Sequence, residues 1–285
     1  MNRLRQAKIG TTLTLALLVG IWSIPTFGLL VTAFREKDQA NLSGWWDIFT
    51  NFGGQQWTTE AFNTVLTRDG MWESFINTVV VTVPSTILPL LIAAHAAFAF
   101  SFLQFRGREI YFAGLVALMV IPLQAALVPV VRGLRTIAEL TGFKLTGTFQ
   151  GTWLMHAAFA LPLAIYVLRN YMMTLPTALI EAARVDGATY YQIFWRLVMP
   201  MSVPALASFA IFQFLWVWND YLIAFIFVGT DHPVMTYKLL RLLGQYGDGW
   251  QNVAAGSFLA LIVPLIVFFS LQRYFVRGLT AGSVK

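Results

Sequence analysis

The chain has 285 residues, of which 58% are hydrophobic and only 11% are charged. This composition excludes a soluble globular protein of this size and predicts a polytopic membrane protein, because each span takes about 20 apolar residues and about six spans use almost the whole length. The net charge of +6 comes from basic residues that flank apolar runs, a pattern of membrane orientation, so we exclude a nucleic-acid partner. The chain has no cysteine, which excludes disulfides, thiolate metal sites and cysteine nucleophiles.

The first apolar run, Ile9–Phe34, contains Pro25 and follows a short basic N-terminus. It is longer than the apolar core of a signal peptide and no small-residue cleavage site follows it, so we expect an anchor that begins in the cytoplasm. Residues 35–70 are polar, rich in turns and contain several tryptophans, which favour the membrane interface. We therefore expect residues 1–71 to form one transmembrane helix and an external segment.

Five further apolar runs make up most of the remaining chain. We predict the second to sixth spans at about Phe75–Phe102, Ile110–Val131, Phe149–Leu168, Val203–Val228 and Val253–Phe275. We place the short basic loop Gln104–Glu109 inside the cell, because basic loops favour the cytoplasmic side. Both termini then also lie in the cytoplasm, and a small majority of all Lys and Arg residues fall on that side. Residues 72–277 are expected to form a core of five spans, and residues 278–285 a cytoplasmic tail.

A partly polar segment, Leu175–Pro200, lies between two of these runs and begins with a short amphipathic piece. Its apolar stripe recurs at helical spacing, and a proline suits the first turn. The stripe consists of Leu175, Ala178, Leu179 and Ala182. Gly187 follows the last periodic residue, and we predict that it stops the helix in the left-handed conformation that glycine adopts without a side-chain penalty.

The second piece of this segment is also amphipathic. We predict one apolar face, with Gln192 and Arg196 on the opposite side and Pro200 at the end of the helix. The predicted apolar face consists of Tyr191, Phe194, Trp195 and Val198.

The segment contains Glu181, Ala182 and Ala183, then Gly187, and then an apolar run that ends at Pro200. This spacing resembles the EAA loop of ATP-binding-cassette importer permeases. Two apolar positions of the family pattern hold exchanged residues of similar size here, Leu197 and Met199. The resemblance implies a short cytoplasmic helix, about Pro176–Asp186, that docks into a separate ATPase subunit within a coupling loop at residues 172–200. The coupling residues implied are Glu181, Ala182, Ala183, Asp186, Gly187 and Pro200.

An amphipathic helix that rests on lipid headgroups is the alternative for the first piece of this segment. Such helices are normally rich in Lys and Arg, whereas this piece carries only Arg184. The paired alanines instead suit the close approach of another protein surface. We therefore favour the docking interpretation.

Several other stretches resemble the maltose-type sugar permeases, and most closely the branch that serves α-glucosides. They are residues 98–108, 121–124, 156–170, 209–220 and 271–285. The similarity extends from about Trp72 to the end of the chain. It implies an all-α membrane protein with the type I importer permease fold and six transmembrane helices, in a bacterial or archaeal inner membrane.

The resemblance also implies the partners of the chain. It implies a homologous second permease subunit, an ATPase dimer and an external solute-binding protein that delivers a sugar, all beside membrane lipid. The chain contains no Gly-x-x-x-x-Gly-Lys-[Ser/Thr] loop, so ATP and Mg²⁺ are expected on the ATPase partner and no cofactor on this chain. No catalytic residues are expected here.

Polar residues inside apolar runs are the candidates for a substrate pathway. Asp220 follows Trp218 and Asn219 in the predicted fifth span, where an ionisable group is costly and therefore a candidate for function. Helix packing explains Asn219 and Asp220 equally well, and tryptophans are also ordinary interface residues. Gln124 lies between two prolines, where it either lines the pathway or caps a kink.

Two histidines, His95 and His156, lie within the predicted second and fourth spans. No cluster of His, Cys or carboxylate residues accompanies them in the sequence, so we expect histidines satisfied inside the membrane and no metal site.

Two other classes of function are disfavoured. An ion-gradient-driven secondary transporter is expected to show a repeat between halves and several intramembrane ion ligands, whereas Asp220 is the one clear intramembrane carboxylate. A membrane-embedded enzyme is expected to show a paired-acid, histidine-rich or serine constellation, and the sequence contains none.

Overall fold

The computed structural model describes residues 2–242 and 249–281, and almost all of this chain is helical. Within these residues the β structure is limited to an isolated bridge between Arg35 and Trp57. The end of the predicted tail, residues 282–285, lies outside the described residues.

The helices of the external segment and the first span are α1 (Asn2–Phe34), α2 (Lys37–Leu42), η1 (Trp45–Phe49), η2 (Phe52–Gly54), α3 (Glu60–Asn63) and η3 (Thr64–Arg68). The remaining helices are α4 (Met71–Phe102), α5 (Arg108–Ala117), η4 (Leu118–Val120), α6 (Leu123–Thr141), α7 (Phe149–Met172), α8 (Thr177–Val185), α9 (Tyr190–Ile193), η5 (Phe194–Val198), α10 (Met199–Trp218), α11 (Leu222–Phe227), α12 (Met235–Arg241) and α13 (Trp250–Ala281).

The described residues contain 5 helical runs that are long and apolar enough to span a membrane, and 6 if a bent pair counts as one span. This confirms an all-α membrane protein, with the count that the sequence predicts when the bent pair is included. The unbent runs are Ile9–Phe34, Met71–Phe102, Phe149–Met172, Tyr190–Trp218 and Trp250–Gln272.

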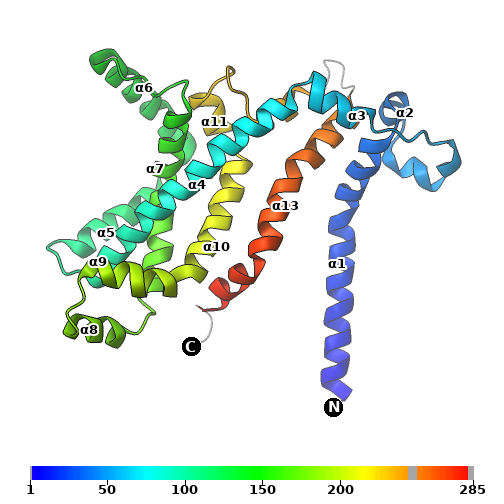
Figure 1. Ribbon diagram of the computed structural model, residues 1–285. Helices are drawn as coiled ribbons and strands as arrows, with labels where there is room; N and C mark the ends of the chain where they lie inside the picture. Colours follow the sequence, from blue (N-terminus) through cyan, green and yellow to red (C-terminus); the bar gives the residue numbers. More distant parts are fainter. Residues whose placement is uncertain (1, 243–248, 282–285) are drawn as a thin grey trace. The chain divides into compact units, whose positions relative to one another are not determined.

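The third span, predicted at about Ile110–Val131, is broken into two helices. The helical pair on either side of Pro122 is bent by 104° (Figure 1). A proline disfavours helical geometry in the residue before it, and Ile121 is extended, with ψ 118. Pro122 is itself extended and begins α6 as its N-cap residue. The break therefore lies at a proline, beside the position where the sequence indicates a kink at Gln124.

The chain divides into two compact units, Met1–Glu73 with Tyr237–Ile262, and Ser74–Thr236 with Val263–Lys285. In the first unit, the segment after α1 is organised by the buried side chain of Arg35. Its Nε donates to Gln55 Oε1 (2.8 Å), and its Nη1 donates to the carbonyl oxygens of Ser43 (2.9 Å) and Gly44 (3.1 Å). These bonds hold together parts of the chain up to 20 residues apart.

Aromatic side chains pack the same segment against α1. Trp45 meets Phe27 edge to face, with ring centroids 5.9 Å apart. It also lies against Gly28, where an added Cβ would come within 2.6 Å of the indole nitrogen. Gly28 therefore permits the close approach of Trp45 to the helix.

In the second unit, α4, α7 and α10 pack through small residues. Ala93 and Ala97 of α4 and Ala164 of α7 are buried in one core cluster with Leu168. Small residues let helix backbones approach closely, which supplies packing energy where lipid leaves little hydrophobic driving force. A further bond from Trp153 Nε1 to the Val80 carbonyl oxygen (2.8 Å) connects α7 to α4.

The Arg35 network predicts a stability effect confined to the segment after α1. Arg35→Met keeps much of the length of the side chain but leaves its carbonyl and amide acceptors unpaired, at a cost of about 1–3 kcal/mol. We expect amide hydrogen exchange in residues 36–58 to accelerate about tenfold or more, measured by mass spectrometry on the full chain. Lys37→Met removes an exposed cation two positions away and serves as the control. Equal exchange in both variants would contradict the assignment.

Candidate functional site

The short helix α8 begins after Pro176, whose φ of −62 and ψ of 113 place it at the N-cap, one residue outside the helix. The Pro176 carbonyl oxygen accepts a bond from the Leu179 N–H (3.2 Å). The helix ends at Val185, with Asp186 as its C-cap residue. The bounds therefore agree closely with the predicted helix over Pro176–Asp186.

Gly187 closes this helix in the left-handed conformation, with φ +84, as the sequence predicts. The Gly187 N–H donates to the Arg184 carbonyl oxygen (3.0 Å), and the Ala188 N–H donates to that of Ala183 (2.9 Å). This pair of bonds is the Schellman motif, which satisfies the last carbonyl groups of the helix. No atom lies within 4 Å of a Cβ added at Gly187, so the constraint is on the backbone and not on space.

The α8 helix buries little of its own surface. Ile180 is its one buried residue, and Ala183 packs partly against the same core. Val185 is 88% exposed and Leu179 is 47% exposed. The predicted stripe members Ala178 and Leu179, with Ala182, Glu181 and Asp186, are all exposed. The helix, which Figure 1 shows between α7 and α9, thus presents apolar side chains and carboxylates that its own chain does not cover.

The next helix begins with a capping box. The Thr189 hydroxyl accepts from the Gln192 N–H (3.3 Å), and Gln192 Oε1 accepts from the Thr189 N–H (2.8 Å). Gln192 was predicted only on a polar face, although the Thr-x-x-Gln spacing also indicates this capping box.

The second helix is buried unevenly along its predicted apolar face. Phe194 and Val198 are buried, as is Ile193, whereas Tyr191 is 73% exposed and Trp195 is 39% exposed. The Trp195 ring lies against the rings of Tyr191 (6.3 Å between centroids) and Phe194 (4.9 Å), so these three predicted residues lie together.

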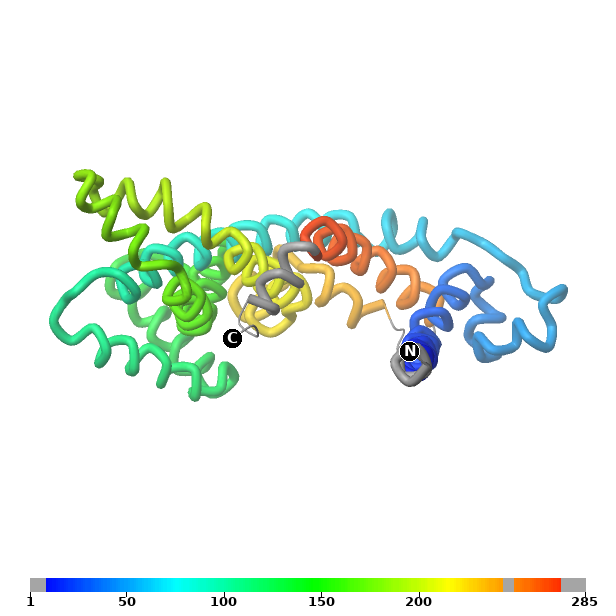
Figure 2. Tube along the Cα trace, turned by 90° about the horizontal axis from the view of Figure 1, so that it is seen from below, coloured from blue at the N-terminus to red at the C-terminus, as the bar shows by residue number. Residues whose placement is uncertain are grey.

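Pro200 was predicted to end this helix, and that prediction is wrong. The helical run continues from Tyr190 to Trp218 (Figure 2). In the π-helical turn directly before Pro200, the Met199 N–H bonds to the Phe194 carbonyl oxygen five residues back. We attribute the continuity to this wider turn, which accommodates a prolyl ring that clashes in a regular α-helix.

Arg169, near the end of α7, contacts the start of α5. Its Nη2 lies 3.2 Å from Glu109 Oε2, and its guanidinium carbon lies 3.9 Å from the Phe112 ring centroid. The sequence does not indicate this pair, because no local pattern connects residues 60 positions apart.

The fifth span was predicted to reach Val228 with Asp220 inside it, but the helix α10 ends at Trp218. Asp220 lies in the break before α11. Its Oδ2 accepts a bond from the Ala224 N–H (2.9 Å), and its carbonyl oxygen accepts one from the Thr236 hydroxyl (2.8 Å). The break therefore provides the carboxylate with a structural partner at the start of the next helix.

His156 is fully buried on α7 and lies against this break. Its Nε2 is 3.7 Å from Asp220 Oδ2, too long for a hydrogen bond, and neither ring nitrogen has a hydrogen-bond partner in the described part of the chain. The expectation of a satisfied histidine is therefore wrong for His156. His95 is exposed, and its Nδ1 lies 2.8 Å from the Leu91 carbonyl oxygen.

The other predicted pathway residues do not form one site with Asp220. Trp218 is buried between the rings of Phe75 (6.0 Å between centroids) and Phe214 (5.5 Å). Asn219 is exposed and bonds to the Leu215 carbonyl oxygen of its own helix. Gln124 is exposed in the first turn of α6, and in the described residues no hydrogen bond or ring contact connects it to Trp218, Asn219 or Asp220.

Comparison with known proteins places this geometry in a family. The family described as "Binding-protein-dependent transport system inner membrane component" matches residues 67–281. The osmoprotective compounds uptake permease protein GgtD of Synechocystis sp. is 47% identical over 93% of this chain and 88% of its own. The alpha-glucoside transport system permease protein AglG of Rhizobium meliloti is 37% identical over 100% of both chains.

Solved structures share the fold. A bacterial ABC transporter involved in the import of the acidic polysaccharide alginate contains a chain that matches with a TM-score of 0.76 at 20% identity, over 95% of this chain and 97% of that one. The MetNI methionine ABC transporter matches with a TM-score of 0.55 at 19% identity, over 73% of this chain and 94% of that one. The family match covers most of the sequence, and the chain is a member of the binding-protein-dependent transport system inner membrane components, the permeases of ABC importers.

Proposed function

We propose that this chain is the permease subunit of an ATP-driven sugar importer and forms half of its translocation pathway. The family membership supports the importer role, and the names of several relatives support a sugar. The relative AglG is named for alpha-glucosides, and MelC of Bacillus subtilis, 30% identical over 96% of this chain, for melibiose, raffinose and stachyose. We therefore propose an α-glucoside or a related glycoside as the solute. Nothing in the comparisons favours an ion-gradient-driven transporter.

The observation that carries the coupling role is the exposed apolar face of α8. A helix face that includes Leu179 and Val185 is costly in water and suits a protein cleft. In the proposed complex, Ala182 and Ala183 allow the ATPase surface to approach, and Glu181 and Asp186 supply charges at its edge. Gly187 fixes the direction in which α8 leaves the chain, and Pro200 lies where the segment joins α10.

The partners follow from this role. We propose a homologous second permease subunit that completes the pathway, a dimer of ATPase subunits that bind ATP and Mg²⁺, and an external binding protein that delivers the sugar. This subunit itself carries out no hydrolysis in the proposal. The inner membrane holds it with both termini in the cytoplasm, and residues 35–70 lie outside.

A matched pair of substitutions at Gly187 tests the cap. Valine is strained in the left-handed conformation by about 1–2 kcal/mol, whereas asparagine adopts it more readily. We expect Gly187→Val to insert normally but to lose the ATP hydrolysis that loaded binding protein stimulates, and Gly187→Asn to retain most of it. The measurement is ATPase activity of the reconstituted complex. Normal stimulation in Gly187→Val would remove the cap from the coupling mechanism.

A charge placed on the exposed face tests docking itself. Val185→Asp adds a carboxylate where the side chain is 88% exposed, so folding of the chain should be unaffected. In a closed interface the unpaired charge is costly, and we expect the affinity for the ATPase to fall at least tenfold. Co-purification and titration with the ATPase measure this, with Tyr191→Asp as the control on the next helix. Unchanged affinity would place the docking surface elsewhere.

Two substitutions at Asp220 separate a role in transport from a role in packing. Asp220→Asn keeps an oxygen for the Ala224 N–H, so we expect normal amounts of assembled complex but reduced sugar uptake if the charge supports passage. Asp220→Ala removes the acceptor, at a cost of about 1 kcal/mol, and should lower assembly as well. Uptake and immunoblotting measure both. Normal uptake by Asp220→Asn would exclude its carboxylate from the pathway.

The proposed orientation is tested by cysteine labelling, because the native chain has no cysteine to remove. We expect an impermeant maleimide added to intact cells to label Gln56→Cys but not Gln104→Cys. Lysis should make Gln104→Cys reactive, which controls for folding. The reverse pattern would invert the proposed topology and place α8 outside.

A further inference from the structure

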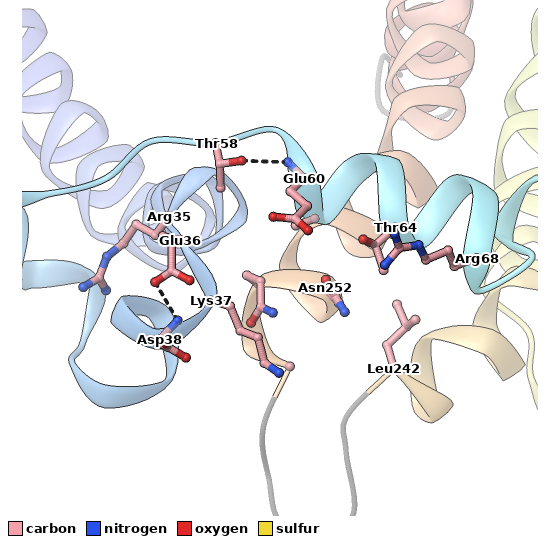
Figure 3. Close-up of a pocket in the computed structure, with 13 residues that line it drawn as sticks. Arg35, Glu36, Lys37, Asp38, Thr58, Glu60, Thr64, Arg68, Leu242 and Asn252 are labelled. Atoms are coloured by element: carbon pink, nitrogen blue, oxygen red, sulfur yellow. Dashed lines mark hydrogen bonds between the residues drawn. The ribbon is translucent and has the colours of Figure 1, made fainter.

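A polar pocket in the first unit takes no part in the coupling or pathway described above. It has a volume of about 540 Å³ and lies between the start of the segment after α1, the helices α3 and η3, and the first turn of α13 (Figure 3). Its lining side chains come almost entirely from polar residues. They include Arg35, Glu36, Lys37, Asp38, Glu60 and Arg68.

One lining residue carries a buried polar atom without a partner. Gln251 is only 6% exposed, and its Oε1 has no hydrogen-bond partner among the described residues. A buried amide oxygen is normally paired, since leaving it without a partner costs its full desolvation penalty. Because Gln251 lines the pocket, a turn of its side chain would let a donor in the pocket reach this oxygen. Asn252 and Thr64 line the same space with further polar groups.

The charges of the lining favour a neutral occupant. Three cationic and three anionic side chains are among the described residues that line the pocket, so the charges of these residues sum to zero. None of them is joined to another by an ion pair within 4.0 Å in the described part of the chain. A singly charged ligand therefore gains no net attraction. A ligand whose groups both donate and accept hydrogen bonds can satisfy carboxylates and cations at once.

The size and lining of the pocket further limit the chemical class of its ligand. A volume of about 540 Å³ is within the usual range of small-molecule sites. No aromatic ring is among its described lining residues, so recognition rests on hydrogen bonds and not on stacking. Hydroxyl groups act as donor and acceptor together, which suits this mixture of side chains.

One wall of the pocket is fixed without a ligand. Arg35 is held by its bonds to Gln55, Ser43 and Gly44, and Glu36 Oε2 accepts the Asp38 N–H (2.8 Å). The Thr58 hydroxyl accepts the Glu60 N–H (3.0 Å), as Figure 3 shows. A preformed wall lowers the entropy that a small ligand loses on binding.

We propose that this pocket is a binding subsite for a neutral, hydroxyl-rich solute, with Gln251 Oε1 and the Glu60 carboxylate as acceptors and Arg68 as a donor. The proposal rests on the proposed function, because the solute class is that of the sugar. It adds a site on this subunit that is separate from the coupling segment and from the residues around Asp220.

The test uses the full-length chain, purified with the subunits that co-purify and placed in nanodiscs without binding protein. Saturation-transfer difference NMR is recorded with sucrose, trehalose and sorbitol as neutral probes, glucuronate as an anion and glycine betaine as a zwitterion. We expect saturable transfer to the neutral probes only. Gln251→Leu and Glu60→Gln should each weaken it about three- to tenfold, the value of one hydrogen bond.

Gln56→Leu, an exposed change outside the pocket lining, is the matched control and should bind as the wild type does. Glu60 is exposed, so Glu60→Gln remains informative if Gln251→Leu does not fold. Equal binding by wild type and both pocket variants, transfer to glycine betaine alone, or no saturable transfer would each overturn the proposal.

Sugar uptake by the same wild-type complex tests the proposed function separately. Uptake without pocket binding refutes this inference alone, and pocket binding without uptake refutes the importer role.

Discussion

A helix inside lipid satisfies its own backbone hydrogen bonds, and every break in it exposes groups that need another partner. This constraint explains where the informative residues of this chain lie. The break at Pro122 divides the third span into two helices, and the break after Trp218 brings a carboxylate to the start of α11. At Gly187, which lies outside the spans, the two Schellman bonds satisfy the last carbonyl groups of α8. Polar side chains and glycine gather at these points because the backbone requires them there.

The same requirement connects the parts of the proposed importer. A coupling helix has to keep a fixed direction relative to the span that it moves. Residues 186–189 separate α8 from the helical run Tyr190–Trp218, so in the proposal this direction depends on the cap at Gly187. The π-helical turn before Pro200 is a point of altered spacing inside that run. In the first unit, the Arg35 guanidinium group connects the short helices of the segment after α1, since it donates to the Gln55 side-chain oxygen and to the Ser43 carbonyl oxygen.

Local sequence signals predicted the features that depend on local geometry. The spans, the helix α8 and the cap at Gly187 follow from periodicity, length and the conformational freedom of glycine, and the structure has them. Periodicity grouped Tyr191 and Trp195 with Phe194, and their rings do lie together, but it does not show that Tyr191 is left exposed. The contacts of Arg35 with Gln55 and of His156 with Asp220 join distant residues, so no local pattern contains them. The roles of the coupling and pathway residues remain predictions.

The uncovered face of α8 also has a consequence for the supply of the subunit in the cell. In the proposed complex an ATPase covers Leu179 and Val185, so a permease made in excess of that partner would present them to water, where such a surface promotes aggregation and attracts quality-control proteases. Assembly of the proposed complex would then protect the chain, and the amount of permease would follow the amount of the ATPase. A single short helix would in this way adjust subunit stoichiometry without a dedicated regulator.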